Sequence, residues 1–134
     1  MTDPQPDVDV ATRWLREAAE ELRAAEVVAA HEELPDRVAG FHAHLAAEKA
    51  LKAELIRLDV EVPRIHDLVG LHRLLPESEQ ARFDESGLAA LNPWTIEGRY
   101  PADLPDSDRS MIEESLAAAR RVLDAATTGS AGDV

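Results

Sequence analysis

The chain has 134 residues, no Cys and a formal net charge of −13 at pH 7. This length fits one domain, which can bury a core without metal or disulfide staples. The lack of Cys excludes thiol redox chemistry and Cys-ligated zinc. The negative charge argues against a general nucleic-acid binder, although clustered arginines can act locally because charges are screened over about 8 Å. The sequence has no signal-peptide pattern and no run of about 18 apolar residues, so we expect a cytoplasmic protein.

The N-terminal part predicts a lead-in followed by a helix. Residues 1–9 are polar with two prolines and are expected to be disordered. Residues 10–31 predict the first helix, because apolar residues recur at helical spacing. A Trp in such a line usually belongs to the core. The line consists of Trp14, Ala18, Leu22, Ala25 and Val28. The short connection that follows favours an antiparallel second helix.

Residues 36–58 predict the longest helix, with Asp36 as its N-cap. At about 100° per residue its apolar residues gather on one face. These are Val38, Phe41, Leu45, Leu51, Leu55 and Ile56. Four polar residues, which we call the polar stripe, fall in the same arc: Arg37, His44, Glu48 and Lys52.

Charge in an apolar face needs a partner, because Glu and Lys are rarely buried unpaired. Glu48 precedes Lys52 by four residues, the favourable order for a helical ion pair, and His44 precedes Glu48 by four. One interpretation is a structural network, buried or at the wet edge of the packing. The other is the wall of a ligand site, because a buried ion pair adds little stability compared with apolar residues.

Three further helices are expected. One begins near Ile65, with His66 and Asp67 in its first turn, and His66 can form a hydrogen bond towards the second helix. Another spans 78–92 with a break at Gly87. The last begins near residue 107 and ends near 126, leaving 127–134 as a flexible tail. No strand pattern occurs, so the sequence predicts an all-α, antiparallel up-and-down bundle of four to five helices over residues 10–126.

A long irregular segment precedes the last helix and carries Trp94, Arg99, Tyr100 and Asp103. Long connections without secondary structure are often functional, and aromatics beside an Arg can clamp a phosphate or a base. Alternatively, Trp94 and Tyr100 cover the core.

Metal and cofactor chemistry are not indicated. His42 and His44 point about 200° apart on a helix and cannot chelate one ion together. His44 with Glu48 is a permitted pair and His66 could add a third ligand, but no second helical pair completes a set. There is no glycine-rich phosphate loop either. We therefore expect neither a metal nor a cofactor.

Three segments together resemble the HEPN domain family, whose name stands for higher eukaryotes and prokaryotes nucleotide-binding. They are FHAHLAAEKALKAEL at 41–55, IHDL at 65–68 and RYPAD at 99–103. The resemblance covers about residues 10–126. It implies a helical bundle that often forms homodimers and that in prokaryotes often pairs with a small nucleotidyltransferase in toxin and antitoxin operons.

Many members of this family are metal-independent ribonucleases with an Arg, four to six residues, and then a His. Arg99 matches the Arg, but no His follows it in this chain. The acid and base roles of RNA cleavage then have no obvious carrier. This departure from the family motif argues against an enzyme but leaves the question open.

Three functions remain open. The first is a non-catalytic module that binds a nucleotide, a nucleic acid or a nucleotidyltransferase partner through Arg99 and Tyr100, with Glu48, Lys52 and His66 behind them. The second is a ribonuclease toxin in which His66 or His44 acts with Arg99. The third is a structural dimerisation domain.

Overall fold

The computed structural model describes residues 6–95 and 109–131. These residues form six α-helices and one short 3-10 turn, and no strand occurs among them. The predicted all-α fold is thus confirmed. None of the helices in these two ranges is long and apolar enough to span a bilayer.

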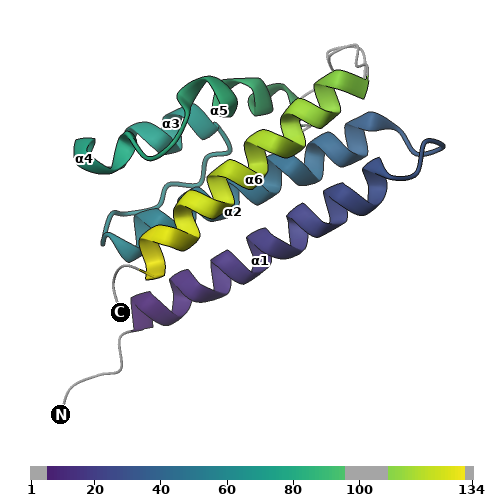
Figure 1. Ribbon diagram of the computed structural model, residues 1–134. Coiled ribbons are helices and arrows are strands. Elements are labelled where there is room, and N and C mark those ends of the chain that lie inside the picture. Colours follow the sequence, from purple (N-terminus) through teal and green to yellow (C-terminus); the bar gives the residue numbers. More distant parts are fainter. Residues whose placement is uncertain (1–5, 96–108, 132–134) are drawn as a thin grey trace.

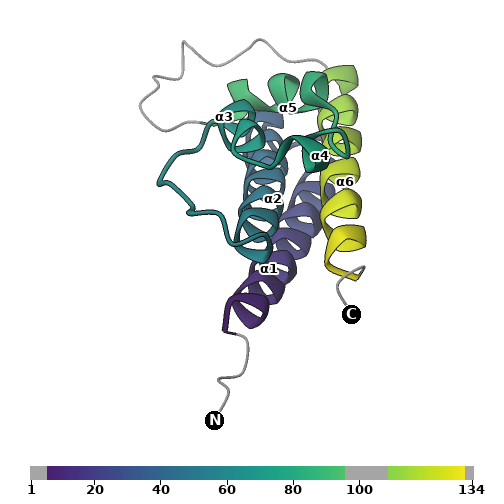
Figure 2. The same cartoon turned by 90° about the vertical axis from the view of Figure 1, so that its left-hand side faces the viewer.

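Three long helices form the body of the bundle (Figure 1): α1 (Pro6–Ala29), α2 (Asp36–Arg57) and α6 (Arg109–Ala131). The short connection turns α2 back along α1, as its length predicted. Three short helices lie across one side of α2 and α6 (Figure 2): α3 (Leu68–Arg73), α4 (Glu77–Gln80) and α5 (Glu85–Leu91). The turn η1 (Asn92–Trp94) follows α5 and contacts α2.

The buried face of α2 differs from the predicted one. Leu51 and Leu55 are fully buried, but the rest of the expected apolar face is only partly so. That remainder is Val38, Phe41, Leu45 and Ile56. The core face is lined by alanines with no exposed surface, namely Ala39, Ala43, Ala46, Ala47 and Ala50. Small side chains let helices approach closely, so the central helix of the bundle turns its alanine face inward.

The expected N-cap of α2 was wrong. Pro35 occupies the cap position and no side chain there makes a capping hydrogen bond. Asp36 is the first helical residue, where a negative charge still favours the helix dipole. Its Oδ1 lies 3.6 Å from Nη1 of Arg109, so it also links the starts of α2 and α6.

Two side-chain caps decide where the short helices begin. Asp67 accepts a hydrogen bond from the Val69 amide at 3.1 Å, so α3 starts at Leu68 rather than near residue 65. Asp84 does the same for α5, and the expected single helix over 78–92 is broken at 81–84. The expected break at Gly87 was wrong, because that residue lies inside α5.

The outer helix ends also differ from the expected boundaries. Helix α1 begins at Pro6 instead of 10 and ends at Ala29 instead of 31. Helix α6 continues to Ala131, five residues past the expected end at 126. Boundaries are the least certain part of a helix read from sequence, because terminal turns depend on tertiary contacts.

Candidate functional site

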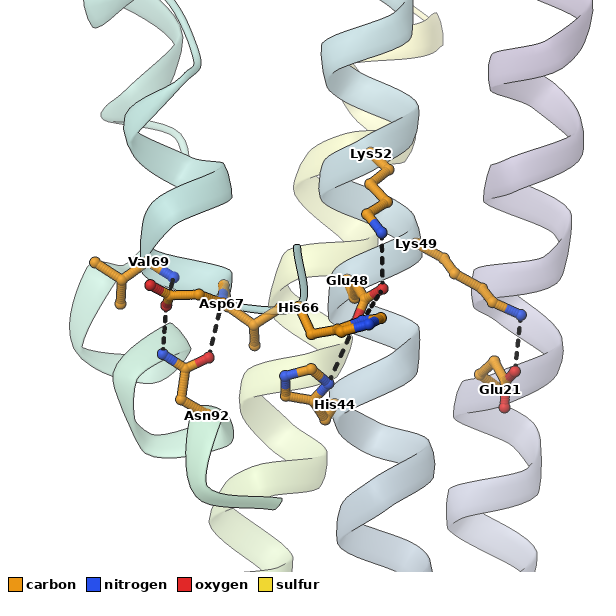
Figure 3. A network of polar contacts seen from close by, with 10 residues as sticks. Glu21, His44, Glu48, Lys49, Lys52, His66, Asp67, Val69 and Asn92 are labelled. Carbon is orange, nitrogen blue, oxygen red and sulfur yellow. Dashed lines mark hydrogen bonds and ion pairs between the residues drawn. The ribbon is translucent and has the colours of Figure 1, made fainter. Parts of the chain in front are cut away.

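The carboxylate of Glu48, in the middle of α2, is the centre of a polar cluster (Figure 3). Lys52 Nζ, one turn further along, donates to Glu48 Oε2 at 2.9 Å. Nδ1 of His66 lies 3.0 Å from both carboxylate oxygens. Nδ1 of His44, one turn earlier, lies 3.6 Å from Oε1. We call these four residues the Glu48 cluster.

Most of the polar stripe is buried. His44 is 1%, Glu48 5% and Lys52 7% exposed. These three residues are therefore buried, as one of the two interpretations of the stripe states, and Glu48 and Lys52 neutralise each other as buried charges must. Arg37 is exposed and does not belong to the network.

His44 is a neutral member of the cluster. Burial lowers the pKa of His44, and the nearby charge of Glu48 only partly offsets this effect. Its Nε2 is buried and has no hydrogen-bond partner among the described residues. Lys52 already neutralises the charge of the Glu48 carboxylate, so a neutral His44 side chain leaves no unpaired charge in the buried cluster.

His66 is the exposed member of the cluster. It lies just before α3, and 43% of its side chain is exposed while its ring nitrogen contacts the buried Glu48. The predicted hydrogen bond from His66 towards the second helix is therefore confirmed. A buried carboxylate fixes this imidazole in one orientation at the protein surface.

Asn92, the first residue of η1, ties that turn to the start of α3 (Figure 3). Its Nδ2 donates to Asp67 Oδ1 at 2.8 Å, and its Oδ1 accepts from the Leu68 amide at 2.9 Å. The bond from Asn92 is the main cause that lowers the pKa of Asp67. The turn is thereby held beside His66. The sequence analysis did not single out Asn92, although an Asn next to a Pro is a turn signal.

The segment carrying the other predicted binding residues continues from this turn. Arg99 and Tyr100, together with Asp103, lie outside the described residues. The turn η1, which precedes this segment in the chain, is anchored to Asp67 and Leu68, the two residues that follow His66.

Trp94 belongs to the core and not to a clamp. It is 2% exposed, and its indole Nε1 donates to Ser115 Oγ at 2.9 Å. The ring packs directly on Gly40 of α2, where an added Cβ would lie 2.2 Å from Trp94 Cδ2. Of the two interpretations of Trp94, covering the core is therefore correct. Gly40 had no signal in the sequence analysis.

A second polar group joins α1 to α2 (Figure 3). Lys49 Nζ donates to Glu21 Oε2 at 2.8 Å, the contact drawn in Figure 3. It also donates to Glu17 Oε1 at 3.2 Å. His42 Nδ1 lies 2.7 Å from Glu21 Oε1. Burial raises the pKa of Glu21, but Lys49 and His42 together bring it below its usual value. The group is a partly exposed seam that fixes the register of the two helices.

Two other features bear on ligand binding. Within residues 6–95 and 109–131, no group of three or more His, Asp or Glu side chains is arranged to hold a metal ion. Hollows between α5 and α6 are lined in part by Asp84, Gly87, Ala118 and Arg121. None of these lining residues belongs to the Glu48 cluster.

Comparisons with known proteins agree with the resemblance noted above. The sequence model of the family described as the HEPN domain matches residues 11–128 of this chain. A solved structure, the crystal structure of TT1696 from Thermus thermophilus, is similar to this chain with a TM-score of 0.73 and 27% sequence identity. The similarity covers 88% of this chain and 96% of that chain. No curated protein matches the sequence.

Proposed function

Since the chain belongs to the HEPN domain family, we propose that it is a non-catalytic module that binds a nucleotide or a nucleic acid through its phosphate. The site consists of His66 at the surface, Glu48 and Lys52 beneath it, and Arg99 and Tyr100 on the segment that follows η1. The protein works as a cytoplasmic homodimer with a nucleotidyltransferase-type partner, in a setting like that of prokaryotic toxin and antitoxin pairs.

The fixed orientation of His66 is the observation that carries this proposal. Its side chain is 43% exposed, while Nδ1 is held 3.0 Å from both carboxylate oxygens of Glu48, whose side chain is 6% exposed. An imidazole held in this way loses little conformational freedom when it binds an anion, which favours affinity. The negative net charge of the chain does not prevent an anion from binding at His66, because charges are screened over about 8 Å.

The roles of the other residues follow from their burial. Glu48 and Lys52 have side chains that are 6% and 9% exposed, so they position His66 and do not contact the ligand themselves. Arg99 supplies the guanidinium that pairs with phosphate oxygens in two-point contacts. Tyr100 supplies an aromatic ring beside it.

Burial also favours binding over RNA cleavage. General acid and base catalysis of cleavage needs two titratable groups within reach of the substrate. His44 was one of the two histidines considered for such a role, but it is 1% exposed and its pKa is lowered by burial. His66 then remains as a single exposed histidine of the cluster.

A thermal-shift experiment tests the proposal. Wild-type protein, Arg99→Ala and His66→Ala are each heated with mono-, di- and trinucleotides and with short RNAs, and the RNA is recovered to check for cleavage. Ligand at 1,000 times its Kd stabilises a protein by about 4 kcal/mol, so micromolar binding is visible at millimolar ligand. We expect a shift in the wild type, its loss in both variants, and intact RNA.

Arg73→Ala is the matched control, because Arg73 is an Arg of α3 whose side chain is 71% exposed. It should keep the full shift. Binding that survives in Arg99→Ala would contradict the assigned site, and cleaved RNA would favour the ribonuclease toxin. No shift for any ligand, with altered dimerisation in Arg99→Ala, would favour the structural dimerisation domain.

A further inference from the structure

Trp14 of α1 does not belong to the core that its helical spacing predicted. Ala18, Leu22 and Ala25 of the same line are buried, and its neighbour Leu15 packs against the buried core. Trp14 is partly exposed and is not part of that hydrophobic cluster of described residues. A large aromatic ring at the surface is typical of recognition sites, where Trp is enriched.

The Trp14 ring is connected to the Glu48 cluster. Lys52 Nζ lies 6.0 Å from the centre of the ring and 2.9 Å from Glu48 Oε2. His66 Nδ1 lies 3.0 Å from both oxygens of the same carboxylate. Trp14 and His66 are therefore two partly exposed rings that each lie next to one member of the buried ion pair on α2, Trp14 near Lys52 and His66 at Glu48.

We propose that Trp14 is the platform on which a base of the ligand stacks, with the attached phosphate at His66. The inference rests on the proposed function and adds a contact to it. Indole faces stack on any nucleobase, so this contact gives affinity with little preference for the base. The ligand class is therefore a nucleoside phosphate or a short single strand, because the bases of a duplex are already stacked on each other.

The charges near Trp14 set the direction of the ligand. Glu17 and Glu21 lie on the same helix within two turns of Trp14, and both are paired with Lys49. Carboxylates on the α1 side disfavour a phosphate there. The base therefore lies on the α1 side and the phosphate on the side of His66, with Lys52 beneath the span between them.

Two variants test this stacking. Trp14→Phe keeps an aromatic face, whereas Trp14→Leu keeps apolar bulk without one. Fluorescence anisotropy measures the binding of short, fluorescein-labelled poly(A) RNA, with AMP added as a competitor. The measurement is made on both variants, on the wild type and on Arg99→Ala. Loss of one stacked base weakens binding by roughly 5- to 150-fold, so we expect that range for Trp14→Leu and less than about threefold for Trp14→Phe.

Intrinsic fluorescence gives an independent readout, since the chain has two Trp and the other, Trp94, is buried. AMP should quench the wild type saturably, and the quenching should disappear in Trp14→Phe although binding remains. Val27→Ala, an exposed apolar residue of the same helix, is the control and should bind like the wild type.

The outcomes separate this inference from the proposed function. If Trp14→Leu binds like the wild type while Arg99→Ala does not, the stacking platform is refuted and the phosphate site stands. If the wild type binds neither probe, both are refuted. If Trp14→Leu alters the mass of the assembly in solution and leaves RNA affinity unchanged, Trp14 belongs to a protein interface and the inference fails.

Discussion

Replacing Glu48 by Gln removes the charge on which the cluster is built and leaves the shape of the side chain unchanged. In the wild type the carboxylate pairs with Lys52 at 2.9 Å and contacts His66 at 3.0 Å. The Lys52 side chain is 9% exposed, so Glu48→Gln leaves an ammonium group buried without a counter-charge. Breaking a buried pair in this way typically costs about 3 to 5 kcal/mol. We expect a loss of that size in the free energy of unfolding.

Urea unfolding followed by the fluorescence of the buried Trp94 measures the effect. Glu17→Gln is the matched control, because Glu17 also pairs with a Lys, at 3.2 Å, but is 52% exposed. It should cost less than about 1 kcal/mol. Adding Lys52→Met to Glu48→Gln should restore most of the lost stability, since an apolar replacement of a buried pair is often neutral. A loss in Glu48→Gln no larger than about 0.5 kcal/mol, the value of an exposed helical pair, would refute this reasoning.

Two further predictions concern packing and pH. Gly40→Ala places a Cβ 2.2 Å from Trp94 Cδ2. Overpacking should lower the free energy of unfolding by about 1 to 3 kcal/mol, which should exceed the gain of about 1 kcal/mol from the higher helix propensity of Ala. Equal or higher stability of the variant in urea would contradict the close contact. Because burial lowers the pKa of His44, the unfolded chain binds a proton near pH 6.5 before the folded protein does, and stability should fall by up to about 1.4 kcal/mol per pH unit below that value. His44→Asn should make the urea midpoint depend less on pH between 7.5 and 5.5. The control His31→Asn, at an exposed position, should keep the dependence of the wild type. If the midpoint changes equally with pH in both variants, the pH dependence does not come from His44.

Contacts between residues one helical turn apart were determined by the sequence itself. The geometry of the α-helix places residues four apart on one face, whatever surrounds it. The pairing of Glu48 with Lys52 and the position of His44 beside them follow from that geometry alone. The extent of α2 follows as well, because nothing between 36 and 57 interrupts a helix.

Contacts that depend on neighbouring elements were decided only by the tertiary structure. Whether a helix face is buried depends on what packs against it, so α2 buries its alanines and leaves Phe41 partly exposed. The same reason takes Trp94 into the core, where Gly40 makes room for it, and leaves Trp14 at the surface. Periodicity describes one helix at a time, whereas burial is a property of the packed bundle.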